Sequence, residues 1–200
     1  MAPSTPIELS PELNYNMTPA RRHITTLDAQ GRSVFTPEQK ILYCDRGGYA
    51  VSWTYATSEF PADLRNNADL QGYLSEDRST PNSVLNTGSR IVHTDGGAIF
   101  NTTNFAPGTQ TVMHRTVSLD FVAVVEGEME LELDSGEKVL LKAGDSIVQR
   151  QTNHLWRNPS KDKPARMISI ITPAHAMTVD GKAIGEEGFS VHAMGKTQPQ

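Results

Sequence analysis

The chain has 200 residues, with 18 Lys and Arg against 23 Asp and Glu, so its formal net charge is -5. This length suits one β domain, and no basic cluster is long enough to follow a nucleic-acid backbone, so we expect no nucleic-acid partner. No apolar stretch approaches the roughly 20 residues of a membrane span, and the single Cys44 cannot form an internal disulfide, so we expect a cytoplasmic protein.

The front part of the chain is irregular. Residues 1–20 are rich in Pro, Ser, Thr and Asn and predict an N-terminal arm that orders only against the barrel edge or another subunit. Residues 21–35 predict a hairpin that turns at Ala29-Gln30-Gly31-Arg32, and Ala50 to Tyr55 predict a further strand.

Residues 61–84 form a long polar stretch, in which we expect a loop with a short helix around Leu64 to Leu74. A loop this long in a compact domain is often functional, so it is either a lid over the mouth of the domain or an insertion without a role. Residues 89–93 and 98–105 flank Asp95-Gly96-Gly97, which predicts a hairpin. His93 supplies a further imidazole only if its strand faces inward.

An alternating strand follows. From residue 114 the even-numbered positions share one strand face, because side chains in a strand alternate with period two. This face combines an imidazole, hydroxyl groups and a carboxylate with two valines: His114, Thr116, Ser118, Asp120, Val122 and Val124. Short strands with close, regular turns continue at 129–133, 138–142, 146–149, 154–158 and 166–171. The pattern is typical of an all-β barrel or two-sheet sandwich.

In this region the chain resembles the cupin family. The first cupin motif fits in spacing at five positions, with Thr in place of its second His and Asp in place of its Glu: Gly108, His114, Thr116, Asp120 and Gly127.

The second cupin motif keeps its His-to-Asn spacing, with its Pro and Gly replaced and one residue fewer before the His: Gly144, Arg150, Thr152, His154 and Asn158. The segments HRTVSLDF and GDSIVQRQTNHLWRN are more specifically similar to small single-domain cupins of fungal polyketide pathways, some of them cupin-domain oxidoreductases.

The resemblance implies a fold: a single cupin β-barrel (double-stranded β-helix, or jelly roll), with an irregular N-terminal arm and few short helices. The corresponding division of the chain is an arm at 1–20, a barrel at 21–178 with its core at 85–173, and a C-terminal tail at 179–200.

The resemblance also carries His114 and His154 onto metal-binding positions and Asp120 onto that of the motif Glu. Two imidazoles and one carboxylate suit a divalent metal, Fe(II), Zn or Mn, with positions left open for substrate. Thr116 is a poor ligand in the place of a His. The alternative is that the two histidines are interior polar groups satisfied by Thr116, Asp120 or water.

Three further side chains are candidate substrate contacts. Thr116 and Trp156 share strand faces with the histidines, and Trp156 would give an apolar wall with one N–H donor, although core packing explains it nearly as well. Arg150 could clamp a substrate carboxylate or phenolate, or else form a surface salt bridge.

Three functions remain open at this point. The leading one is a metal-dependent oxidoreductase acting on a small, largely apolar polyketide or aromatic intermediate. The second is a metal-free isomerase, dehydratase or cyclase in which His114 or His154 moves a proton. The third is a non-catalytic barrel that binds a small molecule. In each case we expect a homodimer, because sheet edges are usually covered by a partner.

Overall fold

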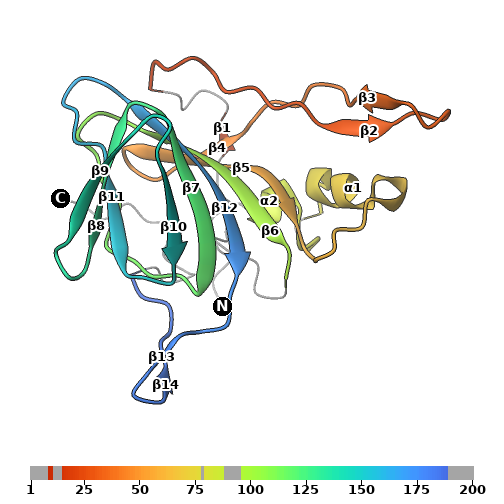
Figure 1. The fold of residues 1–200 in the computed structure, drawn as a ribbon. Helices are drawn as coiled ribbons and strands as arrows, with labels where there is room; N and C mark the ends of the chain where they lie inside the picture. The colour runs from red at the N-terminus through yellow and green to blue at the C-terminus, as the bar shows by residue number, and fades with distance from the viewer. Residues whose placement is uncertain (1–8, 11–14, 78, 88–95, 189–200) are drawn as a thin grey trace, which may run out of the picture.

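The computed structural model describes residues 9–10, 15–77, 79–87 and 96–188, and two β-sheets dominate it (Figure 1). The larger sheet has seven strands, in the spatial order β1 (Leu9–Ser10), β4 (Tyr43–Asp45), β5 (Tyr49–Thr57), β6 (Ala98–Phe105), β12 (Ala165–Pro173), β7 (Ser118–Glu126) and β10 (Ser146–Arg150). The smaller sheet has three, in the order β11 (His154–Arg157), β8 (Glu128–Leu133) and β9 (Lys138–Lys142). All named pairings are antiparallel within both sheets.

The remaining elements are small. Two hairpins stand away from the sheets, β2 (Thr25–Leu27) with β3 (Ser33–Phe35), and β13 (Thr178–Val179) with β14 (Lys182–Ala183) (Figure 1). A one-turn 3₁₀ helix η1 (Arg65–Asn67) leads into α1 (Ala68–Leu74), and α2 (Val84–Thr87) is a single turn. The all-β class with few short helices is therefore confirmed, as is the predicted hairpin over residues 21–35.

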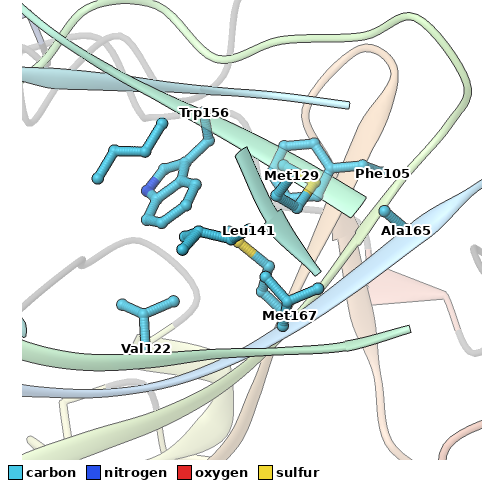
Figure 2. Packing of buried hydrophobic residues seen from close by; sticks show 9 residues of the cluster. Phe105, Val122, Met129, Leu141, Trp156, Ala165 and Met167 are labelled. Carbon is cyan, nitrogen blue, oxygen red and sulfur yellow. The ribbon is translucent and has the colours of Figure 1, made fainter. Parts of the chain in front are cut away.

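The main core lies between the two sheets. Figure 2 shows Val122 of β7 and Met167 of β12 facing Trp156 of β11 and Met129 of β8. The cluster comprises Phe105, Val122, Val124, Met129, Leu131, Leu141, Trp156, Ala165 and Met167. Because Val122 and Val124 are in it, the even-numbered face of β7 is the inner face, as the alternation predicts. A second cluster, Cys44, Trp53, Ala56, Tyr73 and Ile99, lies farther along the large sheet.

Residues 61–84 cover a sheet edge. Beyond its short pairing with β4, strand β5 has no neighbour on one side among the described strands. On this strand the Tyr73 hydroxyl of α1 donates to the Trp53 carbonyl at 2.5 Å, and the Arg22 guanidinium donates to the Thr54 carbonyl at 2.6 Å. The predicted helix is present, and its Tyr73 covers a backbone carbonyl of the β5 edge, whereas the lid over the mouth of the domain stays a prediction.

The N-terminal arm and the hairpin predicted at 89–105 can be compared with the structure only in part. The predicted arm contains β1, which pairs with β4, so the large sheet draws on residues well before the expected core at 85–173. Strand β6 is present, but the rest of its predicted hairpin and His93 lie outside the described residues. In the part of the chain that the structure describes, no helix is long and apolar enough to cross a membrane.

Candidate active site

Two histidine side chains lie side by side where the segment before β7 pairs with the start of β11. His114 lies just before β7 and His154 begins β11, and each backbone N–H donates to the other residue's carbonyl, at 2.8 and 2.9 Å. This antiparallel pairing brings the ring centroids to 4.3 Å, with 51° between the ring planes. Both side chains are buried. The register therefore unites two residues that are 40 positions apart in the sequence.

The local backbone fixes the tautomer of both rings. Nδ1 of His114 lies 2.8 Å from the Val112 carbonyl, and Nδ1 of His154 lies 2.8 Å from the Thr152 carbonyl. Since a carbonyl oxygen only accepts, each Nδ1 carries a proton and donates it. In the neutral ring Nε2 then carries the lone pair. The site thus contains two imidazoles in which Nε2 is an acceptor and in which the Nδ1 hydrogen bond to the backbone fixes the ring orientation.

Burial keeps both rings neutral. It lowers the pKa of His114 to about 3, with the neighbouring His154 as a second cause and the bond to Val112 acting in the opposite direction. Burial also lowers the pKa of His154, opposed by the bond to Thr152. An imidazole whose pKa is lowered by burial is a weaker base, so these rings are better suited to accept a hydrogen bond or bind a metal than to remove a proton.

Two buried hydroxyl groups, those of Thr116 and Ser118, lie between His114 and Asp120 along the chain. Thr116 Oγ1 and Ser118 Oγ lie 2.7 Å apart, and the Ser118 side chain in turn bonds Asp120. All three side chains are buried on the inner face, as the alternation from His114 onward predicts. The Thr116 hydroxyl is therefore paired with that of Ser118.

Asp120 is the titratable group best matched to neutral pH. It pairs across the sheet with Gln149 of β10 and Ile171 of β12, and its side chain is 7% exposed. Burial raises its pKa to about 6, although the Ser118 hydrogen bond lowers it in part. Its Oδ1 is buried without a hydrogen-bond partner among the described residues. A carboxyl group with this pKa is partly protonated near neutrality and can both give and take a proton.

Two amide side chains that were not predicted also belong to this surface. Asn101 of β6 is 5% exposed, and its Oδ1 is buried without a partner in the described structure. Gln149, opposite Asp120, is buried and donates to the Thr152 carbonyl at 3.4 Å and to the Thr152 hydroxyl. Asn101 has the same parity as Ile99 and Phe105 in β6, and this shared parity with two large apolar residues was the signal that could have found it.

The other predicted substrate contacts differ in position. Trp156 lies with His154, at 6.2 Å between ring centroids in an edge arrangement, and packs in the main core. Arg150 does not join the site. It is exposed on β10, and the alternation of that strand turns Gln149 inward and Arg150 outward, so the predicted clamp is not supported.

A C-terminal strap, residues 174–188, runs back against the His114 segment. Arg115 and Glu187 exchange backbone hydrogen bonds at 2.8 and 3.0 Å. The buried Gln151 side chain makes two further hydrogen bonds to the strap: it donates to the Ile184 carbonyl and accepts from the Met177 N–H. Part of the expected tail therefore packs against the segment that carries His114.

The predicted metal ligands do not come together as a set. His114 and His154 could supply two nitrogens to one ion. However, the described ranges contain no group of three His, Cys, Asp or Glu side chains arranged to hold a metal, so Asp120 does not complete a triad with the imidazoles. The two-His, one-carboxylate site expected from the motif does not fit this arrangement.

Comparison with known proteins gives consistent matches. Residues 101–171 match the family model described as Cupin domain. Phomopsin biosynthesis cluster protein D of Diaporthe leptostromiformis is 40% identical over 197 residues, which cover 95% of this chain and 94% of that protein. Cupin-domain-containing oxidoreductase srdD of Neurospora crassa is 35% identical over 179 residues, or 84% of this chain and 82% of the relative. A solved RmlC-like cupin from Shewanella frigidimarina is 25% identical, with a TM-score of 0.34, over 39% of this chain and 68% of that one.

Proposed function

Because this chain belongs to the cupin family and is similar over most of its length to proteins of fungal biosynthesis clusters, we propose that it is an enzyme of secondary metabolism that moves a proton on a small, largely apolar polyketide or aromatic intermediate. The observation that carries the reaction type is Asp120, a buried carboxyl group with a pKa raised to about 6 on the same inner surface as two neutral imidazoles.

Asp120 is the acid–base group in this proposal, and the histidines bind. As a carboxylate, Asp120 takes a proton from an acidic carbon beside a substrate carbonyl, and the C–H electron pair moves toward that carbonyl. Return of the proton at another carbon gives isomerisation, and loss of a neighbouring hydroxyl as water gives dehydration. The Nε2 lone pairs of His114 and His154 accept from a substrate hydroxyl and hold it in place, while Trp156 supplies an apolar wall.

Solvent exchange tests the proposal. Hydroxylated aromatic and polyketide ketones are incubated with the protein in D2O, and proton NMR follows loss of the signal beside the carbonyl. We expect Asp120→Asn to slow exchange by about 10²-fold or more. Glu128→Gln makes the same chemical change at an exposed position and should leave the rate unchanged. Exchange by Asp120→Asn at the wild-type rate would remove Asp120 from the mechanism.

A metal-dependent oxidoreductase is the second candidate, because the printed name of the Neurospora crassa relative is an oxidoreductase and because two neutral imidazoles lie side by side. Elemental mass spectrometry of the wild type, His114→Ala and His154→Ala tests it. Near-stoichiometric Fe, Mn or Zn that disappears in both variants would support this candidate. Protein that stays empty after reconstitution, or metal retained by both variants, would contradict it.

A further inference from the structure

Two buried acceptor oxygens on the inner face of the large sheet have no hydrogen-bond partner among the described residues: Oδ1 of Asp120 and Oδ1 of Asn101. Both side chains are more than nine-tenths buried. Such atoms are rare in folded proteins, because a buried acceptor loses its hydration and must regain a donor elsewhere. They therefore indicate where a ligand with donors would bind.

The sheet register places Asn101 and Asp120 in neighbouring rows, where a row is a set of residues paired directly across adjacent strands. Asn101 pairs with Ser169 of β12, and Asp120 pairs with Ile171, two residues further along the same strand. Ser169 also pairs with Val122, whose side chain belongs to the main core, so both rows face inward. The two oxygens consequently belong to one wall, two strands apart, with a single strand between them.

Hydrogen bonds define the roles of several groups on this inner surface. Nδ1 of each histidine donates to a backbone carbonyl, so in neutral His114 and His154 the other ring nitrogen, Nε2, carries no proton and is an acceptor. The amide of Gln149 already donates to Thr152. At the two unpaired oxygens, Oδ1 of Asp120 and Oδ1 of Asn101, a ligand that offers only ether or carbonyl oxygens would oppose acceptors to acceptors, whereas a ligand with O–H groups would satisfy them.

We propose that the ligand of this site is an apolar ring compound with at least two hydroxyl groups, and that Asn101 selects it by accepting one of them while Asp120 accepts another. The inference rests on the proposed function for the site itself and adds the substrate class and a specificity-determining residue. The apolar part of the ring would pack on the neighbouring Trp53 and Ile99 side chains, which are buried beside these rows.

Matched probes test the donor requirement without any assay of turnover. We would titrate the full chain at pH 8 with 1,3-dihydroxybenzene, with its dimethyl ether and with the corresponding bis(aminomethyl) compound, and follow amide shifts by NMR. The diol should bind at least about tenfold more tightly than the ether, as expected when buried acceptors are left unpaired. Equal affinity for diol and ether overturns the inference. Binding of the diamine without the diol overturns the hydroxyl assignment.

Two asparagine variants separate recognition from structure. Asn101→Leu removes an unpaired buried acceptor, so diol affinity should fall about tenfold while the unfolding midpoint without ligand does not fall. Asn104→Leu is the matched control, since Asn104 Oδ1 accepts from Arg166 Nε at 2.8 Å and its loss should lower the midpoint without changing the preference for diol over ether. An unchanged preference in Asn101→Leu would contradict the assignment of Asn101.

The outcomes also separate this inference from the proposed reaction. Diol binding that depends on Asn101, in a protein that catalyses no proton exchange, upholds the inference and overturns the proposed function. Exchange that depends on Asp120, combined with equal affinity for diol and ether, upholds the function and overturns the inference.

Discussion

The backbone of Gly188 lies directly against that of His114. A Cβ atom added at Gly188 would lie 2.8 Å from the Cα of His114 and would overlap the Met113 carbonyl oxygen. Gly188 also has a φ of +80°, which a residue with a side chain adopts only at a cost. The end of the C-terminal strap thus packs tightly against the segment that carries His114.

We predict that Gly188→Ala loosens this contact. The free energy of unfolding should fall by about 1–3 kcal/mol, and the pKa of His114 should rise from about 3 toward its ordinary value, because burial is the main cause of its lowering. Histidine NMR titration measures the second effect. Gly185→Ala is the control, since a Cβ there meets nothing within 4 Å. The strap would have no influence on the site if both variants titrated like the wild type.

The histidines make stability depend on pH. His114 has a folded pKa below its unfolded value, so its contribution is complete above about pH 6.5 and is lost as pH falls. Between pH 7 and pH 5 this amounts to about 2 kcal/mol, and His154 acts in the same direction. Urea unfolding of the wild type and His114→Asn at both pH values measures it. The variant should show a smaller loss on acidification, and identical losses would argue against a buried neutral His114.

Asp120 acts in the opposite direction. Its folded pKa is raised to about 6, so the ionised form destabilises the native state, and this penalty disappears as pH falls toward 4. We expect Asp120→Asn to raise the unfolding free energy at pH 8 by up to about 3 kcal/mol, and to change it little at pH 4. A stabilised but inactive variant would mark a residue kept for function. Destabilisation at pH 8 would instead indicate a structural role.

Tyr73 has a measurable role at the β5 edge. Tyr73→Phe removes the hydroxyl that donates to the Trp53 carbonyl and accepts from Arg22. We expect a loss of about 1–2 kcal/mol in unfolding free energy, because a buried carbonyl is left unpaired. Tyr55→Phe removes a hydroxyl that donates to the Asp69 side chain, not to a strand carbonyl, and should cost less. The two variants are compared by denaturant unfolding, and equal losses would refute the edge-capping role.

A homodimer remains a prediction. Val148, Phe121 and Ile170 pair across β10, β7 and β12 and form an apolar row on the outer sheet face, with 56%, 48% and 45% of their surfaces exposed. We propose a second copy as its cover, since one patch can meet itself across a two-fold axis. Light scattering should give a dimer mass, and Phe121→Glu a monomer. Leu27→Glu, on the β2–β3 hairpin, is the control. A monomeric wild type would end this proposal.

The sequence was sufficient for features that depend on alternation and turns. The strands from 118 to 173, the inner face of β7 and the hairpin at 25–35 all follow from period-two patterns bounded by Gly, Asp and Asn. The pairing of His114 with His154 was anticipated only through the family motif, because register between distant strands is decided by packing that local patterns do not encode.

The metal triad could not be judged from alternation alone. His114 and Asp120 both fall on even-numbered positions, but β7 begins only at Ser118 and the segment between His114 and β7 is not a regular strand, so shared parity does not establish a shared metal site. Asn101 was not predicted because it is one of four consecutive polar residues in β6 and no motif distinguishes it from its neighbours. The cover of β5 by Tyr73 could not be predicted either, since it depends on which edge the sheet order leaves open.

The bonds from both Nδ1 atoms to carbonyls two residues earlier have a consequence for how a ligand is received. Each ring is oriented by a hydrogen bond within its own chain segment, so its orientation is already set in the folded protein without a ligand. The imidazole rings therefore lose little further rotational entropy when a ligand binds. Binding should therefore leave the backbone and the imidazole rotamers almost unmoved, as in a rigid receptor rather than one that forms around its guest.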